Sequence, residues 1–136
     1  MDAKGRLSLP AKYRPVLAAS ELVLVEGRDQ CLWLYRNDEY QKLIAPLLEN
    51  ELDETLDDLR EVFIAGAASV EVDGAGRIRV PVELRSYAAL SKAVTITGKG
   101  TRMELWDSEL YEQHRQSIDK QGSIKELNKR RNVQRN

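Results

Sequence analysis

Hydrophobic and polar residues follow a pattern that occurs twice along the chain. Each copy begins with a short alternating segment, 6–9 or 77–80, which predicts a strand with its aliphatic side chains on one face. A proline and a brief helical turn follow each strand. Two β-rich segments joined by a glycine-containing turn then predict a hairpin; they are 22–25 and 32–35 in the first copy, and 93–97 and 103–106 in the second.

The two copies correspond residue by residue. Asp2 matches Asp73, an offset of 73 − 2 = 71 residues that continues without a gap to the identical pair Tyr40 and Tyr111. A repeat of this length predicts a tandem of two similar units. Because 136 residues are few for two independent cores, we expect both units to share one core.

A polar residue after each hairpin predicts the start of a helix. Asn37 or Asp38 would cap the first of these helices, and Asp107 or Ser108 the second. Proline lacks the backbone N–H that a helix interior uses, so Pro46 is expected to kink or end the first helix.

A further amphipathic helix, at 52–64, is expected to link the two units. Its acidic residues lie opposite an apolar stripe, and Gly66 would close it. A strand at 69–72 then leads to Asp73, whereas only Met1 precedes Asp2. The repeat therefore predicts that the first strand of the first unit is missing or comes from another segment. The expected stripe consists of Leu52, Leu56, Leu59 and Phe63.

These elements divide the chain into four parts. The first repeat is expected at 1–43, the acidic link at 44–68, the second repeat at 69–115 and a polar, basic tail at 116–136. The tail has few apolar residues to bury, so its end, 121–136, should be helical or disordered.

Composition limits the classes of protein to which the chain could belong. A hydrophobic fraction of 42% and a charged fraction of 32% are typical of a globular protein. No apolar run approaches the ~20 residues that span a bilayer, and the N-terminus lacks a signal-peptide pattern. Cys31 is the single cysteine, which excludes an intramolecular disulfide. These features favour a cytoplasmic protein without a membrane partner.

Charge is balanced overall but unevenly distributed. The net charge of −1 gives no global electrostatic reason to bind DNA. However, acidic residues are concentrated at 49–61 and basic residues at 125–135. Any contact with nucleic acid would therefore have to be local.

The most distinctive polar motif is an Asp-x-x-x-Arg loop in each repeat, Asp2 to Arg6 and Asp73 to Arg77. Gly5 and Gly76 would allow a tight turn, and the carboxylate could accept backbone N–H groups and pair with the arginine. Such a loop could be only a structural turn, which the spacing alone favours. It could also direct the arginine at phosphates or guanine edges, with the aspartate fixing its rotamer.

Nothing in the sequence favours an enzyme. His114 has no Ser or Cys near it in the sequence and fits an exposed helix, while Cys31 fits a buried strand. No zinc spacing or calcium-loop pattern occurs, and Gly74-x-Gly76 lacks the third glycine of a dinucleotide site. We therefore expect no cofactor, no metal and no small-molecule substrate. The aromatic residues expected in the core are Trp33, Tyr35, Phe63 and Trp106.

The doubled motif resembles the MraZ family of AbrB-like (SpoVT-AbrB) bacterial transcription factors. The resemblance rests on Asp-x-Lys-Gly-Arg-Leu-x-x-Pro-x-x-x-Arg at 2–14, its second form Asp-Gly-Ala-Gly-Arg-x-x-x-Pro-x-x-x-Arg at 73–85, and Glu-Leu-Trp-Asp at 104–107; it covers about residues 1–120. It implies an α+β, mainly β fold, a double-split β-barrel of two swapped-hairpin halves with flanking helices. It also implies assembly of copies into a ring.

The resemblance further implies a nucleoid-associated regulator of the division and cell-wall gene cluster. Such a protein would bind double-stranded DNA at short direct repeats in the promoter. Presenting the loops on one face of a ring would strengthen binding by multivalency. The DNA-contacting residues would be Asp2, Lys4, Arg6, Asp73, Arg77 and Arg79, with lesser weight on Gly5, Arg14, Gly76 and Arg85. Arg14 and Arg85 could equally anchor the short helix to the loop.

Two other classes of function remain open. AbrB-like barrels also occur in antitoxins, although those are usually single-repeat chains with an apolar toxin-binding tail. A purely structural assembly protein would use the Asp-x-x-x-Arg loops only to hold turns.

Overall fold

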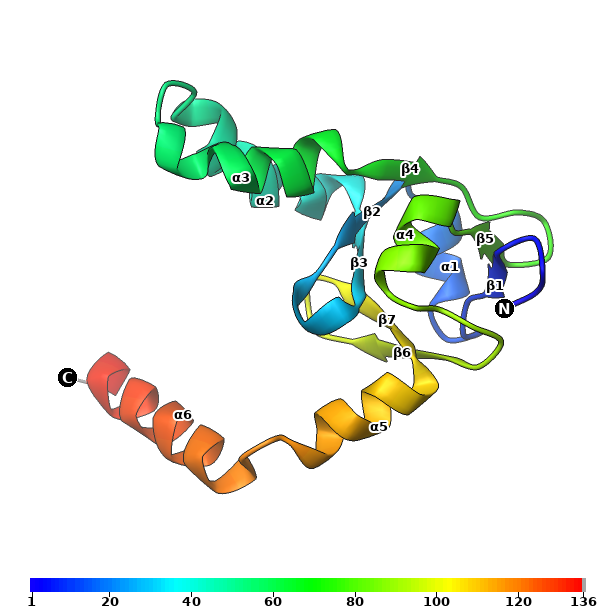
Figure 1. Ribbon diagram of the computed structural model, residues 1–136. Helices are drawn as coiled ribbons and strands as arrows, with labels where there is room; N and C mark the ends of the chain where they lie inside the picture. Colours follow the sequence, from blue (N-terminus) through cyan, green and yellow to red (C-terminus); the bar gives the residue numbers. More distant parts are fainter. Residues whose placement is uncertain (136) are drawn as a thin grey trace.

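The computed structural model describes residues 1–135, in which the same elements occur twice in the same order (Figure 1). The first set is β1 (Arg6–Ser8), α1 (Arg14–Ala18), β2 (Leu22–Glu26), β3 (Leu32–Arg36) and α2 (Asn37–Glu49). The second set is β5 (Arg77–Arg79), α4 (Val82–Tyr87), β6 (Val94–Gly98), β7 (Met103–Asp107) and α5 (Ser108–Gln116). The β2–β3 and β6–β7 hairpins are antiparallel, as predicted.

Each of the two sheets takes strands from both repeats. The larger has the order β4-β2-β3-β7-β6, where β4 is Ala68–Val70, and its centre pairs Leu32 of β3 with Leu105 of β7. The smaller is a ribbon of β1 and β5 in which Leu7 lies opposite Ile78. Strand β4 borders β2, and among residues 1–135 no strand occupies the corresponding place beside β6. Neither repeat completes a sheet alone.

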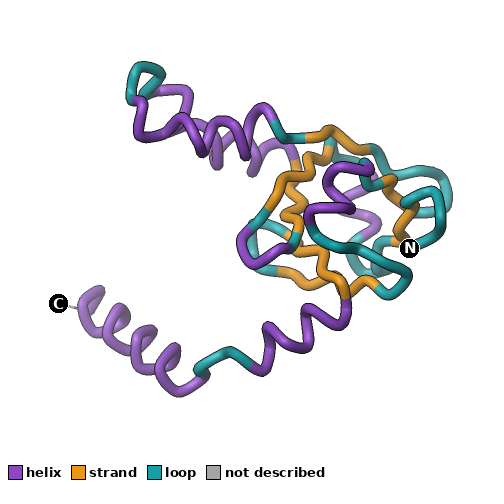
Figure 2. Tube along the Cα trace, viewed as in Figure 1, coloured by secondary structure: helices purple, strands orange, loops and turns teal. Residues whose placement is uncertain are grey.

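The α+β class is confirmed, but the expected architecture is only partly present. All strand pairs are antiparallel, yet within the described residues the strands form two separate sheets and do not close into a barrel. One reason is length, because β1 and β5 pair over only three residues each. The expectation of a mainly β fold is wrong, since helices contain more of the described residues than strands do (Figure 2).

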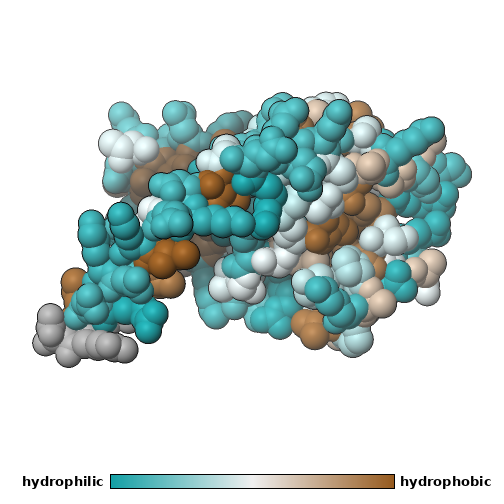
Figure 3. Space-filling model, turned by 90° about the horizontal axis from the view of Figure 1, so that it is seen from below, coloured by the Kyte–Doolittle hydropathy of each residue, from teal (hydrophilic) through white to brown (hydrophobic). Residues whose placement is uncertain are grey.

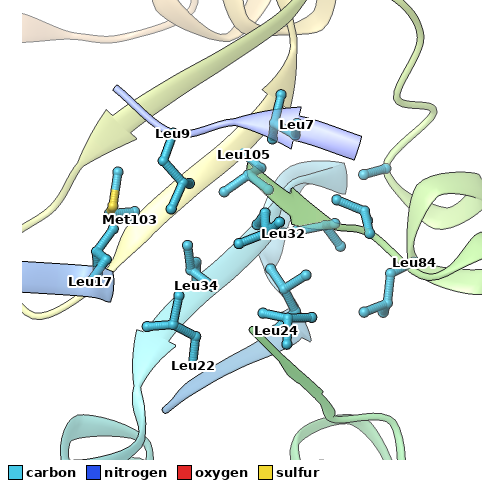
Figure 4. Close-up of a cluster of buried hydrophobic side chains, with 14 residues drawn as sticks. Leu7, Leu9, Leu17, Leu22, Leu24, Leu32, Leu34, Leu84, Met103 and Leu105 are labelled. Carbon is cyan, nitrogen blue, oxygen red and sulfur yellow. The ribbon is translucent and has the colours of Figure 1, made fainter. Parts of the chain in front are cut away.

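Aliphatic side chains of both repeats meet between the ribbon and the larger sheet. Leu9, Leu24, Leu32 and Leu105 are fully buried there, and Figure 4 shows them gathered together, the last three from β2, β3 and β7 and Leu9 from just after β1. Burying one such side chain is worth about 1.5–3 kcal/mol. This shared core holds the ribbon in place on the sheet, which confirms that the two units have one core in common.

An aromatic cluster lies on the opposite side of the larger sheet, under α2. Trp33 stacks on Phe63 with ring centroids 5.7 Å apart, and Tyr40 of α2 donates a hydrogen bond to the Phe63 carbonyl. The predicted core positions of Trp33, Tyr35, Phe63 and Trp106 are confirmed. Cys31 is buried in the same cluster.

The linking segment differs from the single helix expected at 52–64. It consists of a 3₁₀ turn, η2 (Glu54–Leu56), then α3 (Asp57–Arg60) and a π-helical turn, η3 (Glu61–Ala65). Asp53 caps this segment by accepting the Thr55 N–H, so Leu52 falls in the preceding turn and is 95% exposed. The predicted stripe is therefore wrong at Leu52, and Leu59 is also exposed because the helical geometry changes along the segment.

Two details of α2 also differ from expectation. The helix continues past Pro46 to Glu49, because Ile44 and Leu47 on either side of the proline are buried and hold it against the aromatic cluster. Its N-cap is Arg36, without a side-chain cap, rather than Asn37 or Asp38. At α5 the expectation holds, since Asp107 caps the helix by accepting the Leu110 N–H.

The end of the chain forms a second long helix, α6 (Lys120–Arg135), which stands away from the body (Figures 1 and 2). None of the helices within residues 1–135 is both long and apolar enough to cross a membrane.

Candidate nucleic-acid interface

The loop that precedes β1 is closed by the carboxylate of Asp2. Its Oδ1 accepts the backbone N–H groups of Lys4 and Arg6 at 3.0 and 2.9 Å, and its Oδ2 accepts the Nε–H of Arg6 at 2.7 Å. Gly5 has a φ of 79° and donates its N–H to the Asp2 carbonyl. The loop therefore fixes both the backbone turn and the guanidinium of Arg6.

The second loop repeats this geometry. Asp73 Oδ1 accepts the N–H groups of Ala75 and Arg77 at 2.9 and 3.0 Å, and its Oδ2 accepts the Arg77 Nε–H at 3.1 Å. Gly76 has a φ of 76°. The repeat in sequence is thus a repeat in hydrogen bonding, and both arginines are held in the same way.

These hydrogen bonds keep both aspartates ionised. The pKa of Asp2 falls from 3.8 to about 2, mainly because the Arg6 backbone N–H donates to the carboxylate, with help from the guanidinium and the Lys4 N–H. The pKa of Asp73 is lowered for the same reason, with the Arg77 N–H as the main cause. Each carboxylate–guanidinium pair is therefore intact at neutral pH.

In each arginine side chain, only the Nε–H group binds the carboxylate. The Arg6 and Arg77 side chains are 37% and 34% exposed, and the carboxylates take up their Nε–H groups. Within residues 1–135, the terminal Nη atoms of neither arginine donate a hydrogen bond. Those N–H groups can donate two parallel bonds to a phosphate or to the O6 and N7 of guanine.

The ribbon brings the two loops together. Leu7 and Ile78 lie on the buried face of the ribbon. The residues before and after them in each strand therefore line the outer face. In the antiparallel register Arg6 lies opposite Arg79, and Arg77 lies opposite Ser8. Arg6 and Arg77 are thus diagonal neighbours, with Cα atoms roughly 7–8 Å apart. Both fit within the ~12 Å width of a DNA major groove.

The outer face of the ribbon is strongly basic. Arg79 is exposed and has no carboxylate partner among the described residues, and Lys4 is exposed in the first loop. Because Asp2 and Asp73 pair with Arg6 and Arg77, the cations of this surface that have no carboxylate partner among the described residues are Lys4 and Arg79. These two can pair with an anionic ligand. We call the surface of Lys4, Arg6, Ser8, Arg77 and Arg79 the basic ribbon face.

Arg14 and Arg85 support the loops rather than extend the basic ribbon face. Each crosses to the loop of the other repeat: a Cβ on Gly5 would lie 2.8 Å from the Arg85 Nε, and one on Gly76 would lie 2.6 Å from the Arg14 Nε. Arg14 also donates from Nε to the Leu9 carbonyl at 2.8 Å. This favours the anchoring role over direct DNA contact.

Ser8 is a member of this surface that the sequence did not single out. The signal was present, because Ser8 is the polar residue between the buried Leu7 and Leu9. An exposed position in such a strand shares its face with Arg6.

The other candidate chemistry is absent from this surface. Burial raises the pKa of the Cys31 thiol to about 12, so it is no nucleophile at neutral pH. His114 stacks on Trp106 with centroids 4.5 Å apart, against the expectation of a simply solvated residue. Within the described part of the chain, no cluster of three His, Cys, Asp or Glu side chains could hold a metal ion.

Two segments of the chain match the same family model, described as "MraZ protein, putative antitoxin-like". The matched residues are 1–61 and 63–135. The chain belongs to the MraZ family. Each MraZ match contains one Asp-x-x-x-Arg loop, so the two loops are equivalent parts of two family units.

Relatives in several bacteria carry the name "Transcriptional regulator MraZ". The protein of Acetivibrio thermocellus is 44% identical over 117 residues, which cover 84% of this chain and 80% of that protein. Those of Alkaliphilus oremlandii and a Thermoanaerobacter species are 40% and 38% identical and cover 84% and 88% of this chain, and 80% and 83% of their own lengths. The MraZ proteins are named as transcriptional regulators, which is not a class of enzyme.

Proposed function

We propose that this chain is a transcriptional regulator that binds double-stranded DNA through the basic ribbon face. The observation that carries the proposal is the pair of matched loops, each of which fixes an arginine by its Nε and leaves the Nη groups free. The names of the relatives support the regulatory role.

In this proposal the residues have different tasks. Arg6 and Arg77 read guanine edges or clamp phosphates in bidentate fashion, and Asp2 and Asp73 fix their rotamers. Lys4 and Arg79 contact phosphates. Because the overall charge is only −1, binding is confined to this face and should weaken steeply with salt as counterions are released.

The target and the assembly follow from the family resemblance. We propose that copies of the chain form a ring, and that its loops bind short direct repeats in the promoter of the division and cell-wall gene cluster. The protein would act in the cytoplasm, at the nucleoid. Several loops on one ring would bind successive repeats, so modest affinity per loop becomes strong binding overall.

Band-shift titration on a promoter fragment with short direct repeats tests the proposal. Arg6→Gln and Arg77→Gln each remove one free guanidinium, and Arg115→Gln is the matched control because Arg115 is exposed on α5. We expect both loop variants to lose specific binding while circular dichroism and oligomer mass stay unchanged, and the control to bind like the parent.

Two results would decide otherwise. If both loop variants bind like the parent, the basic ribbon face is not the DNA site. If both unfold while the control does not, the loops serve to hold the turns, and a purely structural assembly protein is favoured.

A further inference from the structure

Helix α6 exposes apolar side chains that nothing in the described chain covers. Every side chain from Ser123 to Val133 is exposed, with Ile124 at 58% and Leu127 at 54%. Figure 3 shows hydrophobic atoms within the otherwise hydrophilic projection that leads to the C-terminus. An isolated helix of this length is only marginally stable in water, so α6 gains most from a partner that packs against it.

The exposed apolar residues belong to a defined stripe. Lys120, Ile124, Leu127 and Arg131 are spaced by four, three and four residues, so they share one face of α6. The stripe is apolar in the centre and basic at both ends. Among the described residues neither Lys120 nor Arg131 has a carboxylate partner, whereas Arg130 on another face pairs with Glu126 at 3.2 Å. We call these four residues the α6 stripe.

The turn between α2 and η2 has the complementary character. Leu48 and Leu52 are 57% and 95% exposed there, and the residues around them are acidic. We call this region, 48–58, the acidic tip. Its exposed carboxylates include Glu49, Glu51, Glu54 and Asp58, none of which has a cationic partner within residues 1–135.

The acidic tip is held rigid from inside. Arg60 donates from Nε to the Leu47 carbonyl at 3.1 Å and from Nη1 to the Asp53 carbonyl at 3.0 Å, and Nη2 reaches the Asn50 carbonyl. The Arg60 guanidinium therefore ties the turn together from inside. It also pairs with Asp57 at 3.5 Å, so one of the exposed carboxylates of the acidic tip is neutralised and the four named above are not. A rigid surface loses little entropy when a partner binds.

We propose that the α6 stripe of one copy docks on the acidic tip of a second copy. This contact rests on the proposed function, in which copies of the chain form a ring, and it identifies the two surfaces that would join neighbouring copies. Charge and apolarity match: Ile124 and Leu127 would cover Leu48 and Leu52, while Lys120 and Arg131 face the surrounding carboxylates.

A second copy fits better than the same chain or DNA. In Figure 1, α6 and the α2–α3 region are separate projections from the body, and α5 is fixed by the stacking of His114 on Trp106. DNA phosphates could pair with the basic ends of the α6 stripe but would not cover its apolar centre. Each copy has one stripe and one tip, so the contact is head-to-tail and can close into a ring.

Sedimentation of the full chain with reciprocal charge reversals tests the contact. The stripe variant is Lys120→Glu/Arg131→Glu and the tip variant is Glu51→Lys/Glu54→Lys. Arg28→Glu/Arg115→Glu is a control with the same charge change as the stripe variant, at two exposed arginines outside both surfaces. We expect each of the first two to weaken self-association at least about tenfold. An equimolar mixture of the two should form a mixed complex, because reversed stripe meets reversed tip, and the control should assemble like the parent.

Other outcomes overturn the inference. It fails if the parent is a monomer, if both variants assemble like the parent, or if the mixture stays dissociated although both variants are folded. A stripe variant that assembles normally but loses DNA binding would assign α6 to DNA. The proposed function fails separately, through Arg6→Gln and Arg77→Gln proteins that assemble and still bind DNA.

Discussion

Arg85, in the second repeat, packs directly over Gly5 in the loop of the first, so close that a Cβ on Gly5 would lie 2.8 Å from its Nε and Cζ. Arg14 and Gly76 form the reciprocal contact. The two loops are thus each supported by the opposite repeat. The sequence repeat alone does not show that Arg14 and Arg85 each contact the loop of the other repeat.

This contact predicts a graded response to alanine at three glycines. Gly5→Ala must adopt a φ of 79° and would also place its Cβ 2.8 Å from the Arg85 guanidinium and 2.9 Å from the Val80 carbonyl oxygen, so it should destabilise by about 2–3 kcal/mol. Gly100→Ala has φ strain alone and should cost about 1–2 kcal/mol. Gly74→Ala has neither and should stay within about 0.5 kcal/mol. Urea denaturation measures all three, and equal losses for Gly5 and Gly100 would mean that Arg85 and the Val80 carbonyl both move aside at no cost.

Acid should leave the first loop formed to unusually low pH. The pKa of Asp2 is depressed from 3.8 to about 2, so its contribution to stability is complete above about 3.8 and is lost as the pH falls through about 2. Carboxyl NMR of the folded protein should show this midpoint. In Arg6→Gln the pKa should rise only in part, because the residue 6 backbone N–H, the main cause of the shift, still donates. A midpoint near 3.8 in the parent would contradict the loop geometry.

The sequence predicted local structure well and contacts between repeats poorly. Alternation and glycine placement identified both hairpins and the buried faces of β1 and β5, because these depend on neighbouring residues. The crossing of Arg14 and Arg85, and the pairing of β1 with β5, depend on how two similar units meet. Because the two repeats have similar sequences, the sequence cannot show whether a residue contacts its own repeat or the other one.

The errors at the linking segment have a similar origin. Leu52 fits a helical stripe by spacing, but Asp53 caps the helix one residue later and excludes it. Pro46 is a helix breaker by propensity, yet the burial of Ile44 and Leu47 keeps α2 continuous. In both cases a tertiary or capping interaction outweighs the local preference. At the candidate site, the pairing of Asp2 with Arg6 and of Asp73 with Arg77 was predicted and is present, Ser8 was not singled out, and contact of these residues with DNA stays a prediction.

Glu104 should be the most sensitive charged residue for stability. It is 4% exposed, accepts two hydrogen bonds from Arg102 and accepts the Trp106 indole N–H at 3.1 Å. Glu104→Ala leaves both donors unpaired and should destabilise by about 2–4 kcal/mol. The exposed Glu112→Ala is the control and should change stability by less than about 0.5 kcal/mol. Chemical denaturation followed by tryptophan fluorescence measures both, and similar values for the two would show that Arg102 and Trp106 are readily rehydrated.

The two halves of the basic ribbon face differ at two pairs of equivalent positions, Lys4 with Ala75 and Ser8 with Arg79, and only the second pair lies opposite the loop arginines in the ribbon. Ser8 and Arg79 are equivalent in the repeat, and each lies opposite the loop arginine of the other half: Ser8 opposite Arg77, and Arg79 opposite Arg6. Both are exposed, so exchanging them should leave the fold intact. The pair therefore offers reciprocal substitutions on one surface.

If Arg79 contacts a phosphate, Arg79→Ser should lower DNA affinity on specific and non-specific fragments alike, and reduce the slope of log K against log salt by about 0.9 for each phosphate that is no longer neutralised. Ser8→Arg should act in the opposite direction, by adding a cation beside Arg77. Filter binding or fluorescence anisotropy over a range of salt measures both slopes. The double exchange, Ser8→Arg with Arg79→Ser, keeps the charge of the face constant and should return the slope toward the parent value. A parent-like slope in Arg79→Ser would show that Arg79 does not contact DNA. Arg6 and Arg77 would then be the only strand residues proposed to contact it.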